Sequence, residues 1–171
     1  MLLERCTWQE VERYLEHARG IILPVGSTEQ HGPTGLIGTD ALCAELIARG
    51  VGEATGALVA PTLNFGMAQH HMGFCGTMTL RPQTLLAVLV DLLGSLAQHG
   101  FERCLVINGH GGNMATIMAG QHGDDHGGVL RAARPRQPGG DSPLAEPALP
   151  PAHLVEPAGG DAGAKGALRR A

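Results

Sequence analysis

Aromatic side chains are scarce in this sequence of 171 residues, and this limits what its core can be made of. Phe, Trp and Tyr together make up 3% of the chain, whereas hydrophobic residues of all kinds make up 43%. We therefore expect a core built from Leu, Val, Ile, Ala and Met. A chain of this length is long enough for one domain with a sizeable core.

Long basic runs and long apolar runs are also absent. The net charge is -4 with neutral histidines, and no basic patch marks a nucleic-acid partner. No segment has the roughly 18 uninterrupted apolar residues that a membrane span requires, and the N-terminal segment lacks the apolar stretch of a signal peptide. We expect no nucleic-acid partner, no membrane partner and a cytoplasmic location.

Paired cysteines are missing as well. The four cysteines, Cys6, Cys43, Cys75 and Cys104, are widely spaced and form no CxxC pair. This spacing gives no sign of a disulfide framework or of a thiolate metal site. We expect reduced thiols that act as small core residues.

Continuous apolar runs alternate with helical patterns along most of the chain. Helices are predicted over residues 7–20, 39–51, 81–100 and 113–120, and strands over residues 20–25, 56–63, 77–80 and 101–108. Strands that are apolar throughout are typical of parallel sheets covered on both faces. The sequence therefore predicts an α/β fold with a mainly parallel central sheet and helices on both faces.

The composition changes after Gln121. From His122 to Ala171 there is no Ile, Met, Phe, Trp, Tyr or Cys, and seven of the eleven prolines lie there. Few large side chains remain to offset the conformational entropy lost on folding. We expect one α/β domain over residues 1–121 and a disordered Pro/Gly/Ala-rich tail over residues 122–171.

A polar loop follows the first predicted strand. The segment "LPVGSTEQHGPTGLIGTD" places Glu29, His31 and Asp40 among four glycines. Glu29 and His31 are two residues apart, so their side chains point the same way in an extended backbone. The glycines allow tight turns, which can bring Asp40 back towards this pair.

A second polar loop, "NGHGGN", follows the strand predicted at 101–108 and carries His110. Ligand sites of open parallel sheets form outside the carboxyl ends of the strands, so neighbouring strands would bring Glu29, His31, Asp40 and His110 together. Two histidines and two carboxylates suit one or two divalent ions, Zn²⁺ or Mn²⁺. The alternative is three unrelated features: a capped turn, a hydrogen-bonding histidine and a helix N-cap at Asp40.

Three segments occur in an order that resembles the creatininase (creatinine amidohydrolase) family: "LPVGSTEQHGPTGLIGTD", "HHMGFCGTMTLRPQTL" and "INGHGGN". The resemblance covers about Thr7 to Gly120. It implies an α/β fold and a metal-dependent hydrolase that cleaves carbon–nitrogen bonds in small cyclic or linear amides; some relatives trim peptides. Carried over position by position, it implies four metal ligands, Glu29, His31, Asp40 and His110, with Asp40 bridging two ions.

The chain departs from the family pattern in three places. Thr34 stands where the family often has a histidine, and Gly112 stands where creatininase has a glutamate. Relatives with "NGHGGN" instead take a glutamate from a later "HAGE"-like segment, and this sequence has no such segment. The later strands and helices of the family give way to the tail, so we expect the C-terminal part of the domain to be missing through a frameshift or truncation. Four tail residues, His122, Asp124, Asp125 and His126, either supply a substitute ligand or form a solvated turn.

Two hypotheses for function stay open. The first is an amidohydrolase that cleaves a small-molecule amide with metal-activated water, with His70 and His71 either reaching the substrate or serving as ordinary loop histidines. The sequence names no proton donor to the leaving nitrogen. The second is a catalytically inactive metal-binding remnant, or a partner subunit of a complete relative. An apolar sheet edge left by missing strands would favour association, so a homo-oligomer is also considered.

Overall fold

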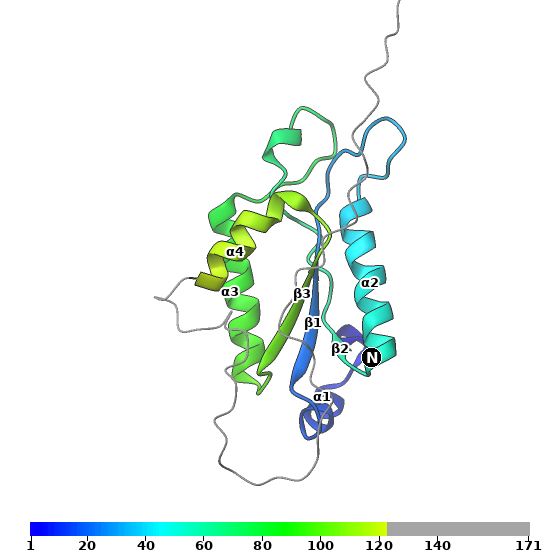
Figure 1. Ribbon diagram of the computed structural model, residues 1–171, viewed down its shortest axis with the longest axis vertical. Helices are drawn as coiled ribbons and strands as arrows, with labels where there is room; N and C mark the ends of the chain where they lie inside the picture. The colour runs from blue at the N-terminus through cyan, green and yellow to red at the C-terminus, as the bar shows by residue number, and fades with distance from the viewer. Residues whose placement is uncertain (123–171) are drawn as a thin grey trace, which may run out of the picture.

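The computed structural model describes residues 1–122, which form a three-stranded sheet between two layers of helices (Figure 1). The elements in chain order are the 3-10 helix η1 (Leu3–Arg5), α1 (Trp8–Leu15), β1 (Gly20–Val25), α2 (Thr39–Thr55), β2 (Leu58–Val59), η2 (Gln69–His71), α3 (Pro82–Gln98), β3 (Arg103–Asn108), η3 (Gly111–Asn113) and α4 (Met114–His122). The expected tail lies, after His122, outside the described residues.

The strand order is β2-β1-β3, and both pairings are parallel. β1 and β3 pair along their whole length, from Gly20 opposite Arg103 to Val25 opposite Asn108. α2 covers one face of the sheet, and α3 and α4 cover the other (Figure 1). The predicted α/β fold with a parallel sheet and helices on both faces is therefore confirmed. The carboxyl ends of β1 and β3 lie side by side, so the polar loops that follow them begin at the same edge.

Side chains of β1 alternate between two apolar clusters. Ile21, Leu23 and Val25 belong to the cluster that includes the buried leucines of α3, Leu85, Leu89 and Leu93. Ile22 belongs to the cluster on the opposite face, with Ala44 and Ala48 of α2. Both faces of the central strand are buried, which explains why it reads as a continuous apolar run.

The first helix begins at the predicted N-cap. The carboxylate of Glu10 accepts hydrogen bonds from the backbone N–H of Thr7, at 2.7 Å, and from its hydroxyl, at 2.8 Å. This is the capping-box arrangement that the spacing predicts. Tyr14 of the same helix donates its hydroxyl hydrogen to the carbonyl oxygen of Gly20, which ties α1 to the start of β1.

Three expectations are wrong in detail. The strand predicted over residues 56–63 is only two residues long, since Pro61 has no N–H to extend a ladder. The segment at 77–80 forms isolated bridges at Met78 and Thr79 rather than a strand. Cys43 and Cys75 are exposed, whereas Cys104 is half-buried and burial raises the pKa of its thiol to about 12.

None of the helices within residues 1–122 has the length and apolar composition needed to cross a membrane.

The packing of α3 can be tested with two leucines of that helix. Leu89 is 1% exposed in the main cluster, whereas Leu92 is 41% exposed. We expect Leu89→Ala to lower the free energy of unfolding by about 2–5 kcal/mol, because it leaves a cavity, and Leu92→Ala to change it by less than about 1 kcal/mol. Urea unfolding of both variants measures the difference. Equal losses would contradict this placement of α3.

Candidate metal centre

The four side chains predicted from the two polar loops come together at the carboxyl edge of β1 and β3. Glu29 and His31 follow β1, Asp40 lies in the first turn of α2, and His110 follows β3. Glu29, Asp40 and His110 are buried, with exposed fractions of 5%, 8% and 6%. Ligand atoms of Glu29, His31 and Asp40 all lie within 4.8 Å of one another.

One ring nitrogen of His31 is held by the backbone and the other faces Asp40. Nδ1 lies 3.1 Å from the carbonyl oxygen of Glu29. A carbonyl oxygen can only accept, so Nδ1 carries the proton of the neutral ring and donates to it. The unprotonated Nε2 then points its lone pair at Oδ1 of Asp40, 2.9 Å away.

His110 repeats this arrangement with its two nitrogens exchanged. Nε2 lies 3.0 Å from the carbonyl oxygen of Met67, so it donates there. Nδ1 is left with a lone pair 2.9 Å from Oδ2 of Asp40. The separation is short enough for a hydrogen bond, but Oδ2 has no donor with acceptable geometry. Two acceptors therefore face each other.

Asp40 thus lies between two imidazole lone pairs, and only positive charge relieves this contact. Burial lowers the pKa of both His31 and His110, but hydrogen bonds to backbone carbonyls and the nearby Asp40 outweigh burial, so both pKa values are raised. A proton on either ring is one such positive charge.

Glu29 adds a second buried carboxylate. Its Oε2 has no hydrogen-bond donor and lies 3.4 Å from Nε2 of His110. Its other oxygen, Oε1, lies 3.7 Å from Nε2 of His71. A buried carboxylate oxygen without a hydrogen-bond donor is energetically costly, so a cation near Oε2 of Glu29 would stabilise the site. The donor set of this edge fits a divalent ion, and ligating histidines commonly donate their second nitrogen to a backbone carbonyl, as both rings do here.

A network of asparagines that the sequence analysis missed holds the edge together. The amide of Asn113 donates to the carbonyl oxygen of Gly26, at 2.9 Å, and to Oδ1 of Asn108, at 3.1 Å. Its own Oδ1 accepts from the backbone N–H of Met67, at 2.9 Å. Asn113 is fully buried and joins the ends of β1 and β3 to the loop that carries Met67. The sequence feature that could have revealed this network is the pair of asparagines, Asn108 and Asn113, at the two ends of "NGHGGN".

Two glycines of this segment are required by close packing. A Cβ at Gly109 would overlap the carbonyl oxygen of Asp40. A Cβ at Gly112 would overlap Nε2 of His110 and lie 2.5 Å from the carbonyl oxygen of Met67. The position at which creatininase itself has a glutamate therefore has no room for a side chain here.

The other residues named in the sequence analysis lie beside the centre, away from it, or outside the described residues. His70 and His71 form η2 beside the centre: their ring centroids are 4.0 Å apart, and the ring of His70 is nearly parallel to that of His110 at 6.5 Å. Thr34 is exposed in the loop before α2. The side chain of His122, and all of Asp124, Asp125 and His126, lie outside the described part of the chain.

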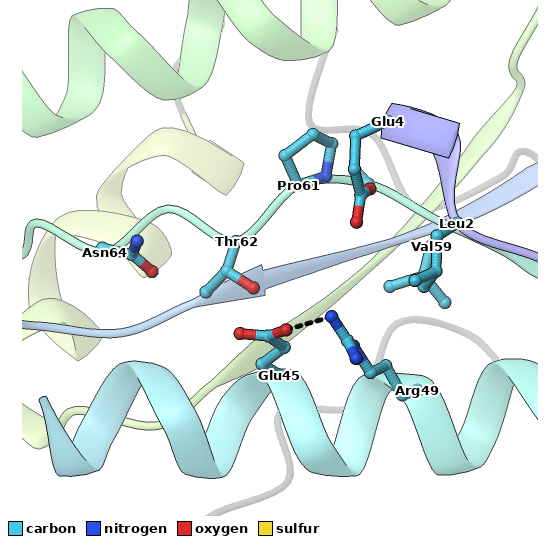
Figure 2. A pocket seen from close by; sticks show the side chains of 9 residues that line it. Leu2, Glu4, Glu45, Arg49, Val59, Pro61, Thr62 and Asn64 are labelled. Atoms are coloured by element: carbon cyan, nitrogen blue, oxygen red, sulfur yellow. Dashed lines mark ion pairs between the residues drawn. The ribbon is translucent and has the colours of Figure 1, made fainter. Parts of the chain in front are cut away.

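A separate hollow of about 220 Å³ lies between α2 and the chain that follows β2 (Figure 2). Glu45 and Arg49 of α2 form an ion pair on one side, and Thr62 and Asn64 lie on the other. None of the four predicted ligands lines it. This hollow is not part of the metal centre.

Comparisons with known proteins point to one family. The profile described as creatinine amidohydrolase matches residues 4–137. The chain is 36% identical over 120 residues to creatinine amidohydrolase of Pseudomonas putida, covering 67% of this chain and 46% of that protein. It is 33% identical to 3-dehydro-scyllo-inosose hydrolase of Thermotoga maritima, covering 66% of this chain and 37% of that protein. It is 38% identical to a mycofactocin precursor peptide peptidase of Mycolicibacterium smegmatis, covering 58% of this chain and 42% of that protein.

Solved structures give the same result. A creatininase crystal structure matches with a TM-score of 0.66 and 34% identity, over 70% of this chain and 48% of that one. Matched creatininase structures include a manganese form and a Zn-Zn form, in line with the predicted divalent cofactor. The chain spans about half the length of these relatives or less.

The close packing at the centre gives a test. Gly109→Ala should push Asp40 and the start of α2 away from β3. We expect a loss of about 1–3 kcal/mol in the free energy of unfolding and a weaker affinity for Zn²⁺. Gly50→Ala is the control, because a Cβ there meets nothing within 4 Å and alanine favours a helix by up to about 1 kcal/mol. Urea unfolding and Zn²⁺ titration measure both effects; equal Zn²⁺ affinities would contradict the packing argument.

Proposed function

Because the chain belongs to the creatininase family, we propose that it hydrolyses a carbon–nitrogen bond in a small cyclic or linear amide. The ligands of the divalent metal would be Glu29, His31, Asp40 and His110. The observation that carries the proposal is the contact of both oxygens of Asp40 with imidazole lone pairs, at 2.9 Å each. A carboxylate and two neutral imidazole rings do not hold such a contact without a cation.

Each side chain has a definite part in holding the ion. His31 would bind through Nε2 and His110 through Nδ1, since their other nitrogens donate to backbone carbonyls. Asp40 presents one oxygen to each ring, which supports a bridging position between two ions. When bound, the metal would supply Lewis-acid activation of water and stabilisation of the charge that develops on the amide oxygen. Zn²⁺ and Mn²⁺ both suit this mixture of carboxylate and imidazole ligands.

A second candidate is an inactive metal-binding chain that associates with a complete relative or with its own copies. Two observations favour it. Gly112 leaves no room for the glutamate that creatininase itself has at this position, and the outer face of α2 exposes Leu42, Leu46 and Ile47. Exposed apolar patches often mark association surfaces. Cytoplasmic location and a small-molecule amide as partner remain predictions.

Metal content tests the proposed ligand set. Purified wild-type protein is expected to contain one or two divalent ions per chain by elemental analysis. Asp40→Ala should lose them, because both histidines then lack the carboxylate that draws a cation to them. Asp91→Ala, which removes an exposed carboxylate of α3, should keep the wild-type content. Retention of metal by Asp40→Ala would rule out this centre.

Turnover separates the two candidates. We expect hydrolysis within a panel of small amides that includes creatinine, loss of activity on treatment with a chelator, and recovery with Zn²⁺ or Mn²⁺. Ammonia release and mass spectrometry of the products measure the reaction. Bound metal without turnover of any amide would favour the inactive, associating chain.

A further inference from the structure

A glutamine beside the centre determines what His71 can do. Nε2 of Gln30 lies 2.9 Å from Nδ1 of His71, and the ring of His71 faces Glu29 through its other nitrogen, Nε2. His71 lies in η2, and its side chain is 24% exposed. Ligand atoms of Glu29, His70 and His71 also lie within 4.8 Å of one another, so proximity alone would make His71 a further metal ligand.

The orientation of the Gln30 amide is fixed by the backbone. The N–H of Gly32 donates to Oε1 of Gln30, at 2.8 Å. Since an amide nitrogen cannot accept from an N–H, the oxygen must lie on this side. The NH₂ group of Gln30 then faces His71 and can only donate to it.

This contact selects the tautomer of His71. Nδ1 accepts from Gln30, so it uses its lone pair, and the proton of the neutral ring resides on Nε2. His71 therefore presents an N–H towards Oε1 of Glu29, at 3.7 Å, which is too long for a hydrogen bond. Binding a metal through Nε2 would require a proton on Nδ1, which would then meet the N–H of Gln30.

Three of the four histidines near Glu29 thus divide into two kinds. His31 and His110 donate to backbone carbonyls and turn lone pairs to the centre, whereas His71 accepts from a side-chain amide and turns an N–H to it. We infer that His71 is not a metal ligand but the hydrogen-bond donor of the site, which binds the carbonyl oxygen of an amide substrate. Gln30 is its positioning residue.

The surroundings of His71 suit this role. Its N–H has no hydrogen-bond acceptor within the described residues, because Oε1 of Glu29 is too distant. The ring of His70 packs against it at a centroid distance of 4.0 Å, and the ring of Phe74 lies 6.4 Å away on an edge. An N–H donor directed at a developing oxyanion is a common device for stabilising the transition state of amide hydrolysis. The inference rests on the proposed function for the nature of the ligand.

The tautomer can be measured directly. Long-range ¹H–¹⁵N correlation of the imidazole rings in the full-length, ¹⁵N-labelled chain at about pH 8 distinguishes protonated from unprotonated ring nitrogens. We expect the proton of His71 on Nε2 both without metal and after addition of Zn²⁺. In Gln30→Glu the new carboxylate should accept from Nδ1, so the proton should move there. A proton on Nδ1 in the wild type, or loss of the Nε2 proton on addition of Zn²⁺, would overturn the inference.

The binding role is tested with acetohydroxamate, a small amide-like probe with a carbonyl oxygen. In Zn²⁺-loaded His71→Phe we expect unchanged metal content and a dissociation constant about tenfold higher, because one hydrogen bond to the probe is lost. His99→Phe, at an exposed histidine that follows α3, should match the wild type in both respects. Loss of Zn²⁺ from His71→Phe would make His71 a ligand, and an unchanged dissociation constant would remove its binding role.

These outcomes are distinct from failure of the proposed function. A chain that binds no Zn²⁺ at all would sink the metal-dependent activity, while the position of the proton on His71 in the metal-free protein would still support or overturn the role of Gln30. A chain that binds Zn²⁺ through His71 would keep the activity and overturn the inference.

Discussion

The contact of Asp40 with two imidazole lone pairs is the interaction on which the account of this site depends. Asp40 is 8% exposed, and its two oxygens lie 2.9 Å from Nε2 of His31 and from Nδ1 of His110. The rings cannot turn to offer their N–H groups instead without giving up hydrogen bonds to the carbonyls of Glu29 and Met67. A buried carboxylate between two such rings is held by a cation, either protons or a metal.

The fold supplies this contact through the pairing of β1 with β3. Six residue pairs in register place Val25 opposite Asn108, so the loops that carry Glu29 and His110 leave the sheet at one edge. Asp40 reaches the same edge because α2 packs closely against the sheet through Ala44 and Ala48. The absence of a side chain at Gly109 lets the first turn of α2 approach the end of β3. Small residues on the scaffold thus set the distances in the site.

The sequence predicted the parts that depend on local pattern. Continuous apolar runs identified β1 and β3, and polar residues just after them identified all four side chains that the structure brings together. It could not predict the tautomers of His31, His110 and His71, because each depends on the placement of one carbonyl or amide group in the folded loops. It also missed the role of Asn113, whose three hydrogen bonds join segments up to 87 positions apart. The length of β2 was misjudged because loss of pairing, not loss of apolar character, ends the strand at Val59, two residues before Pro61.

Anomalous diffraction from crystals grown with Zn²⁺ tests the central claim most directly. We expect one or two anomalous peaks beside Asp40, with zinc bound through Nε2 of His31 and through Nδ1 of His110 at about 2.1 Å. Binding through the opposite nitrogen of either ring would contradict the tautomers. A crystal with no anomalous peak beside Asp40 would contradict the metal centre itself.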